Sequence, residues 1–284
     1  MTYAPAPSGT VSLRWSATTG RVITAVMLNL VRTGTTGRHP PLVIAHGLFG
    51  SARNWGAIAK RLATGRQVLA VDMRNHGLSF RSERHDYPAM AGDLAEVIDA
   101  EGGQADVLGH SMGGKAAMML ALTHPDAVRR LIVADIAPVP YTHSHEGHIE
   151  AMRALRLDGL RTRAQADEAL AAHIDSPEIR SFLLQSLDLQ ADPPHWRINL
   201  EALARQMDKI TGWPEVEGRF DGPLLFLSGA ESDYLRDKHR PAIKALFPNA
   251  RFAKLLGAGH WLHAEKPADF ATTVRTFLDA GDER

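Results

Sequence analysis

The chain has 284 residues, of which 44% are hydrophobic and 23% charged, the balance of an ordinary globular protein. Its 32 basic and 32 acidic residues cancel, so nothing indicates the clustered basic face of a nucleic-acid-binding protein. The chain has no cysteine, which excludes disulfides, thiolate nucleophiles and zinc–thiolate sites and fits a reducing cytoplasm. We find no secretory signal pattern at the start and no run of roughly 18 apolar residues that could span a bilayer. We therefore expect a cytoplasmic protein with no membrane or nucleic-acid partner.

The beginning of the chain predicts an antiparallel hairpin. Apolar residues alternate with polar ones over residues 11–15 and again over residues 22–30. Thr18, Thr19 and Gly20 lie between the two segments and are typical of a turn. Alternation with a period of two residues indicates strands that are buried on one face.

The pattern then changes to short apolar runs separated by helix-like segments. The expected strands are Leu42–Ala45, Val68–Val71, Asp106–Leu108, Leu131–Ala134, Leu224–Leu227 and Arg251–Leu256. The expected helices are Trp55–Leu62, Met90–Ala100, Lys115–Leu122 and Ala268–Leu278. Unbroken apolar runs are typical of strands buried on both faces, and alternation with helices indicates a mostly parallel sheet.

Strand signals stop between Pro138 and Gly212. Four helix-like segments follow one another there: Glu146–Leu157, Arg163–Ile174, Glu178–Leu189 and Asn199–Ile210. The β/α alternation resumes afterwards. We therefore predict an α/β core formed by residues 1–137 and 213–284, with residues 138–212 inserted as a helical cap.

A G-x-S-x-G motif centres on Ser111, in Gly109-His110-Ser111-Met112-Gly113. Such a pentapeptide occurs by chance in roughly one chain in ten, so its setting decides its meaning. Here it follows an apolar run and opens a helix-like segment, which is the strand–turn–helix setting of a nucleophile elbow. The flanking glycines permit a tight turn, and the helix N-terminus favours negative charge. We therefore predict that Ser111 is a nucleophile.

A serine hydroxyl needs a base, and His260 is the best placed of the 14 histidines. It follows the last expected strand, and this class of hydrolase runs nucleophile, acid, histidine along the chain. An oxyanion hole needs backbone N–H groups. We predict that Met112 provides one and Leu48 the other, with Phe49 as the next candidate. Phe49 and His46 are also predicted at the substrate site, His46 mainly as a prop for its loop.

Two aspartates are candidates for the acid that orients the histidine. Asp135 ends the apolar run 131–134, one strand beyond the elbow, and Asp233 follows the next strand of the sheet. Many members of the hydrolase superfamily carry the acid in that second loop, at a place that here holds Ser232. Spacing does not settle a difference of one residue in a loop, so both aspartates remain open on this reasoning.

Four longer strings resemble the YbfF-type bacterial esterases and their mitochondrial abhydrolase-domain relatives. They are Asp72-Met73-Arg74-Asn75-His76-Gly77-Leu78-Ser79, Gly109-His110-Ser111-Met112-Gly113-Gly114-Lys115, Asp135-Ile136-Ala137-Pro138-Val139, and Gly257-Ala258-Gly259-His260-Trp261-Leu262-His263-Ala264-Glu265-Lys266-Pro267. The similarity covers most of the chain and is weakest in the helical insertion. It implies the α/β-hydrolase fold, an acid at Asp135 and an assisting role for Ser232.

Several other residues receive a structural interpretation. Asp72, Arg74 and His76 are expected to hold loops by hydrogen bonds, and Lys115 is expected to be solvated or ion-paired. The group His143, His145 and His148 lacks the i,i+4 spacing of a helical metal site, so no metal site is expected. For the apolar residues of the insertion, packing is favoured over substrate contact: Phe182, Leu183 and Trp196.

Together these residues predict a serine carboxylesterase that works through an acyl-enzyme intermediate and needs no metal or cofactor. The resemblance implies esters with small to medium acyl groups, with thioesters as a further class. Three alternatives remain: another serine-dependent hydrolase of this fold (a carbon–carbon bond hydrolase, a perhydrolase or an acyltransferase), a small-molecule receptor with little turnover, and a structural interaction protein. The chain is expected to be a monomer or a small homo-oligomer.

Overall fold

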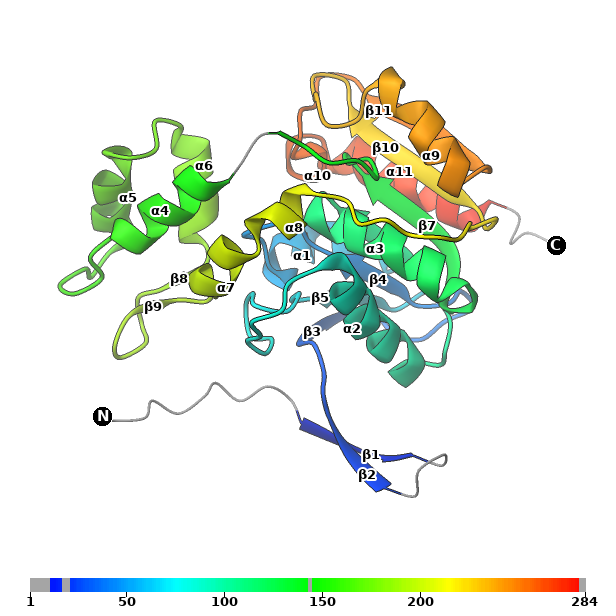
Figure 1. Cartoon of the computed structure of the whole chain (residues 1–284), viewed down its shortest axis with the longest axis horizontal. Coiled ribbons are helices and arrows are strands. Elements are labelled where there is room, and N and C mark those ends of the chain that lie inside the picture. The colour runs from blue at the N-terminus through cyan, green and yellow to red at the C-terminus, as the bar shows by residue number, and fades with distance from the viewer. Residues whose placement is uncertain (1–10, 17–20, 143–144, 281–284) are drawn as a thin grey trace.

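A seven-stranded sheet forms the centre of the computed structural model, which describes residues 11–16, 21–142 and 145–280 (Figure 1). Its strands lie in the order β11 (Ala250–Leu255), β10 (Leu224–Gly229), β7 (Val128–Ala134), β6 (Ala105–His110), β4 (Leu42–Ala45), β5 (Val68–Val71) and β3 (Leu30–Thr33). Neighbouring strands are parallel except for β3, which pairs antiparallel with β5. The mostly parallel sheet predicted from the apolar runs is thus confirmed.

Helices cover both faces of this sheet. One layer contains α1 (Gly56–Leu62), α10 (Leu262–Glu265) and α11 (Pro267–Asp279), and the other contains α2 (Tyr87–Ala100), α3 (Met112–Thr123) and α9 (Arg240–Leu246). Successive residues of β4 point to opposite layers: Leu42 and Ile44 pack in the first, and Val43 in the second. Both layers are apolar, which explains why this strand reads as an unbroken apolar run. Single 3-10 turns lie at η1 (Ala52–Trp55), η2 (Pro125–Ala127) and η3 (Asp237–His239).

The expected hairpin is present, but its second strand is shorter than the alternation suggested. Strands β1 (Val11–Ser16) and β2 (Arg21–Val26) pair antiparallel in a sheet of their own, and the turn expected at 18–20 lies outside the described residues. The chain then leaves the strand at residue 27 and enters the main sheet as β3 at Leu30. Asn29 marks the break, because its N–H donates to Ser79 Oγ and its carbonyl accepts from the N–H of Asp72.

Residues 138–212, which we call the cap segment, lie between β7 and β10. They contain α4 (Glu146–Ala154), α5 (Arg163–Ala171), α6 (Pro177–Leu184), α7 (Leu200–Arg205) and α8 (Met207–Thr211). In Figure 1, α4 to α7 lie to one side of the sheet. The expectation that no strand occurs here is wrong, because β8 (Leu187–Asp188) and β9 (His195–Trp196) form a short hairpin. Strands of two residues are too short to produce a periodic pattern, and this hairpin ends the helix expected over 178–189 at Leu184.

A buried ion-pair network lies at the end of the sheet opposite the elbow. Asp106, near the start of β6, accepts from Arg66 at 2.7 Å and from Arg129 at 2.7 and 2.8 Å. Arg66 also donates to Asp279 at 2.6 Å, at the end of the closing helix α11. Burial raises the pKa of Asp106, and the two guanidinium groups oppose that shift. The network therefore fastens α11 to the central strands at the end remote from the carboxyl edge.

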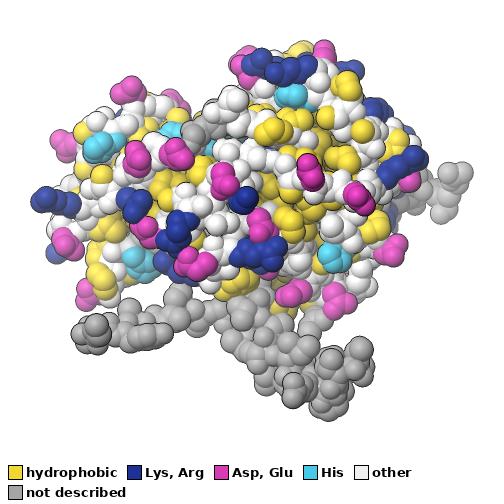
Figure 2. Space-filling model, viewed as in Figure 1, with side chains coloured by type: hydrophobic (Ala, Val, Ile, Leu, Met, Phe, Trp, Pro, Cys, Tyr) yellow, Lys and Arg dark blue, Asp and Glu magenta, His cyan; other side chains and the backbone are white. Residues whose placement is uncertain are grey.

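The surface shows no segregation of charge on the face in Figure 2, where acidic and basic side chains lie among one another. In the described part of the chain, no helix combines the length and the apolar character needed to cross a bilayer.

Candidate active site

Ser111 lies at a sharp turn between β6 and α3. Its backbone has φ 51° and ψ −119°, a strained conformation for a residue with a side chain. The turn requires close backbone approach on both sides. A Cβ at Gly109 would overlap the backbone of Gly113, and a Cβ at Gly113 would overlap the carbonyl oxygen of Ala45 on β4. The two motif glycines thus allow the turn that holds Ser111 above the carboxyl edge of the sheet.

His260 reaches this serine from the loop that follows β11. Its Nε2 lies 3.1 Å from Ser111 Oγ, and its Nδ1 lies 2.7 Å from Asp135 Oδ2. The carbonyl of His260 accepts a hydrogen bond of 2.9 Å from Nε2 of His110. Burial holds the pKa of His110 well below its usual value, assisted by the neighbouring His263 and His260. A neutral His110 donates through one nitrogen, which fits its role as a clamp on the histidine loop.

Asp135, rather than Asp233, lies next to the histidine. Asp135 follows β7 with φ 54°, and its side chain is fully buried. It also accepts hydrogen bonds from the Gly229 N–H at 3.3 Å and from Ser232 Oγ. Asp233 is 84% exposed and pairs with Arg236 at 2.8 Å. The left-handed backbone at Asp135 turns its carboxylate towards the histidine loop, which one-dimensional spacing does not reveal.

The loop after β4 brings backbone N–H groups to the serine. The N–H of Phe49 donates to His76 Nε2 at 3.2 Å, whereas the N–H of Leu48 has no acceptor among the described residues. Met112 is the first residue of α3, where N–H groups lack a partner within the helix. The N–H of Phe49 is thus engaged within the protein, whereas that of Leu48 has no such acceptor in the described part of the chain.

Buried histidines support this loop. His46 donates to the Gly47 carbonyl at 2.7 Å and accepts from the N–H of Met73 at 2.9 Å. His76 donates to the Arg74 carbonyl at 3.0 Å, with its other nitrogen engaged by Phe49. Burial lowers the pKa of both imidazoles, so each remains a neutral ring with one donor and one acceptor.

The other residues that follow β5 are likewise engaged with the protein. Asp72 accepts from the N–H groups of Ala52 and Leu78 at 2.8 and 2.9 Å. Arg74 forms a bidentate pair with Asp93, with distances of 2.6 and 2.7 Å. These contacts fit the loop-holding role expected from the sequence.

Lys115 differs from the expectation that it is solvated or ion-paired. Its side chain is 1% exposed, and its ammonium group donates to the carbonyls of Thr211 and Gly212 at 3.0 and 2.6 Å. Burial lowers the pKa of Lys115 to about 7. The position of Lys115 on α3 did not reveal its burial, because the cap segment that covers it is distant in sequence.

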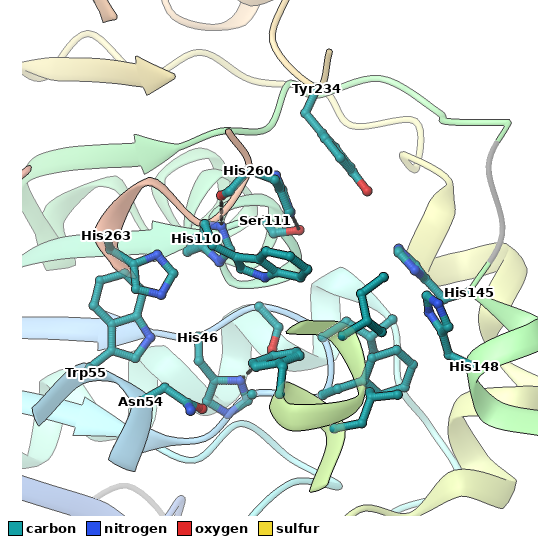
Figure 3. Close-up of a pocket in the computed structure, with 18 residues that line it drawn as sticks. His46, Asn54, Trp55, His110, Ser111, His145, His148, Tyr234, His260 and His263 are labelled. Carbon is teal, nitrogen blue, oxygen red and sulfur yellow. Dashed lines mark hydrogen bonds between the residues drawn. The ribbon is translucent and has the colours of Figure 1, made fainter. Parts of the chain in front are cut away.

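A cavity of about 280 Å³ opens beside Ser111 and is lined mostly by apolar atoms. Figure 3 shows Trp55 and His263 on one side and His145 and His148 on the opposite side, with Ser111 and His260 between them. The predicted residues His46, Leu48 and Phe49 line it. Lining residues that sequence reasoning missed or assigned to packing are Trp55, Ile179, Phe182, Leu183, Tyr234, Trp261 and His263. Met112 borders a smaller neighbouring cavity.

No metal site is apparent in this region. Among the residues that the structure describes, no group of three acidic or histidine side chains is arranged to hold a metal ion. His145 and His148 stack with their ring centres 5.9 Å apart on the cavity wall. His143, the third member of the sequence cluster, lies outside the described residues.

The mostly parallel sheet, the strained serine after its central strand and the histidine after its last strand define an α/β hydrolase. The model of the alpha/beta hydrolase fold family matches residues 40–267, and the chain belongs to this family.

Named relatives extend over most of the chain. Mouse sn-1-specific diacylglycerol lipase ABHD11 is 44% identical over 248 residues, which cover 84% of this chain and 81% of that protein. Esterase YbfF of Escherichia coli K12 is 39% identical over 241 residues, covering 84% and 93%. The solved structure of a marine microorganism esterase has a TM-score of 0.84 and 38% identity, covering 88% of this chain and 99% of its own. The predicted resemblance to YbfF-type esterases is confirmed.

Proposed function

We propose that Ser111, His260 and Asp135 hydrolyse carboxylic esters through an acyl-enzyme intermediate. The hydrogen-bonded series from Ser111 Oγ through His260 to Asp135 carries this proposal, with distances of 3.1 and 2.7 Å. His260 takes the serine proton as Oγ attacks the ester carbonyl, and gives it to the departing alcohol. Water then attacks the acyl-enzyme with His260 again as base. Asp135 holds the tautomer that directs Nε2 at the serine.

The N–H groups of Leu48 and Met112 would stabilise the oxyanion formed in both steps. Donors fixed in a buried loop and at a helix start need no rearrangement as charge develops, which makes such groups effective in catalysis. The chain is a carboxylic ester hydrolase by its family and by its relatives named as esterases and a lipase. None of these relatives is named as a carbon–carbon bond hydrolase, a perhydrolase or a receptor, whereas a Saccharomyces cerevisiae relative that is 35% identical over 280 residues is named as a probable alcohol acetyltransferase, the acyltransferase alternative.

The cavity supports substrates of small to medium size. Its volume of about 280 Å³ lies near the lower end of ligand pockets. Trp55 and His263 stack on one wall with their ring centres 4.2 Å apart. Phe182 from the cap segment packs against Trp261 with the ring centres 5.8 Å apart. We expect an ester with a short or medium acyl chain to fill this space and a long chain to require displacement of the cap segment.

Active-site labelling tests the nucleophile. A fluorophosphonate probe should label the wild type and the control Ser82→Ala, whose hydroxyl accepts only a local hydrogen bond from the Arg84 N–H. Ser111→Ala should neither bind the probe nor hydrolyse p-nitrophenyl butyrate. A folded wild type without labelling and without hydrolysis, or full labelling of Ser111→Ala, contradicts the proposal.

A series of p-nitrophenyl esters from acetate to palmitate tests the substrate size. We expect kcat/KM to be highest at short or medium chains and to fall for palmitate. Phe182→Ala, which opens the cap side of the cavity, should move the optimum to longer chains. Ile149→Val, a buried change on α4 outside the lining residues, is the control and should keep the wild-type optimum. A wild-type optimum at palmitate would contradict this assignment.

We further propose that the protein acts in the cytoplasm as a monomer or a small homo-oligomer on a small-molecule ester. The lack of cysteine supports a reducing compartment. Light scattering of the purified chain measures the mass in solution, and a mass above that of a tetramer contradicts this part of the proposal.

A further inference from the structure

Tyr234 lies flat against the catalytic histidine. Its ring stacks on the imidazole of His260 with a centroid distance of 3.9 Å and an interplanar angle of 18°. Its N–H donates to Ser232 Oγ at 3.3 Å, and that hydroxyl donates to Asp135. Residues 232–234 therefore contact both the acid and the base. The position of this loop therefore bears on the orientation of the imidazole.

One hydroxyl from the cap segment fixes this loop. Tyr141 Oη donates to the carbonyl of Tyr234 at 2.6 Å and accepts from the N–H of Ala137 at 2.9 Å. Ala137 lies two residues after Asp135, so the hydroxyl joins the loop that carries the acid to the loop that carries the stacked ring. Burial raises the pKa of Tyr141, and the hydroxyl therefore stays protonated and able to donate.

Tyr141 is itself held at the base of the cap segment. Its N–H donates to the Thr211 carbonyl at 3.0 Å, which brings the beginning and the end of the cap segment together. The ammonium group of Lys115 lies 4.8 Å from the Tyr141 ring centre and donates to the same Thr211 carbonyl. A cation over an aromatic face is attractive, particularly away from water. The Tyr141 ring is thus held between α3 and the end of the cap segment.

We propose that Tyr141 is a positioning residue for His260, acting from the base of the cap segment through the carbonyl of Tyr234. The role rests on the proposed ester hydrolysis, because it concerns the histidine that serves as base. Without the hydroxyl, the 232–234 loop keeps only the hydrogen bond from Ser232 to Asp135 as a link to the acid, and the imidazole spends less time aligned between Ser111 and Asp135. The loss falls on the chemical steps rather than on substrate binding.

Tyr141→Phe tests this role because it removes only the hydroxyl. Tyr87→Phe is a matched control: the hydroxyl of Tyr87 also bonds a backbone carbonyl of the cap segment, that of Ile210, and its ring also lies near Lys115, at 5.5 Å. Only Tyr141 reaches the 232–234 loop. With p-nitrophenyl butyrate, we expect Tyr141→Phe to lower kcat about 5- to 10-fold with KM changed less than about twofold, because the loop loses its hydrogen bond to Tyr141. Tyr87→Phe should stay within about twofold.

Two further measurements separate positioning from a loss of folding. Tyr141→Phe loses two hydrogen bonds and Tyr87→Phe loses one, so Tyr141→Phe should have the lower melting temperature, and circular dichroism at the assay temperature should show both variants folded. Tyr234→Ala, which removes the stacked ring, should lower kcat at least as strongly as Tyr141→Phe. Equal kcat values for Tyr141→Phe and Tyr87→Phe, or a smaller loss of kcat for Tyr234→Ala than for Tyr141→Phe, overturn the inference.

Ser111→Ala in the same series distinguishes failure of the proposed function from failure of the positioning role. If Ser111→Ala retains hydrolysis, the proposed function fails. If Ser111→Ala is inactive and Tyr141→Phe matches its control, only the positioning role fails.

Discussion

Replacing Asp135 by Asn should remove most of the activity while leaving the shape of the site intact. The carboxylate of Asp135 accepts hydrogen bonds at both oxygens, from His260 Nδ1 and Ser232 on one and from the Gly229 N–H on the other. An amide has only one accepting oxygen. In either orientation its NH₂ group faces an N–H, of His260 or of Gly229, and the imidazolium of the transition state loses its negative partner.

The magnitude follows from this geometry. A triad histidine that loses its carboxylate in this way loses about 10⁴-fold in kcat, which corresponds to about 5 kcal/mol of transition-state stabilisation. We expect that loss for Asp135→Asn with p-nitrophenyl butyrate, with KM nearly unchanged. Asp233→Asn alters an exposed carboxylate paired only with Arg236 and should stay within about twofold.

Steady-state kinetics of both variants, with circular dichroism to verify folding, form the assay. A loss below tenfold for folded Asp135→Asn, or a collapse of Asp233→Asn alone, would refute the reasoning from the hydrogen bonds.

Three further changes test other parts of the structure. Asp106→Asn removes the buried carboxylate that Arg66 and Arg129 share, leaves Arg66 with Asp279 alone and should lower the free energy of unfolding by about 3 kcal/mol in urea titrations; a change below 1 kcal/mol would contradict this. Burial lowers the pKa of His263 from 6.5 to about 3. Because the folded protein keeps this imidazole neutral, the effect of His263 on the free energy of unfolding is most favourable above pH 6.5 and is lost as the pH falls towards 3. His263→Phe keeps a ring against Trp55 and takes up no proton, so between pH 7.5 and 5 the variant should lose about 2 kcal/mol less than the wild type; equal losses in denaturant titrations would be inconsistent with the shift. Gly113→Ala places a methyl group against a carbonyl oxygen of β4 and should abolish soluble expression or fluorophosphonate labelling; a soluble variant that labels at the wild-type rate would show that the turn has room.

The features that the sequence predicted well are those with a local signature. Ser111 lies between flanking glycines at a strand end, and His260 follows the last strand, so their positions at the carboxyl edge of the sheet follow from topology. The choice between Asp135 and Asp233 was open because it depends on a left-handed backbone at one residue. Resemblance favoured Asp135, and the geometry agrees with that preference.

The aromatic contacts of the site could not be predicted from the sequence. Tyr234 and Tyr141 lie in loops without periodicity, and their partners are brought near only by the folded sheet and the returning cap segment. The burial of Lys115 depends on the same return, since its acceptors are about a hundred residues away in the chain. For Phe182, an amphipathic helix pattern identifies the buried face but does not tell a core from a cavity wall.

The contact between the Tyr141 N–H and the Thr211 carbonyl has a consequence for how this enzyme could diverge. Because the two ends of the cap segment lie next to each other, its length and sequence can change without a change in the sheet. Closing a longer excursion between fixed ends adds little entropy cost. Related proteins could therefore exchange the part of the cap segment between Tyr141 and Thr211 as a unit and acquire new substrates, provided that Tyr141 is kept.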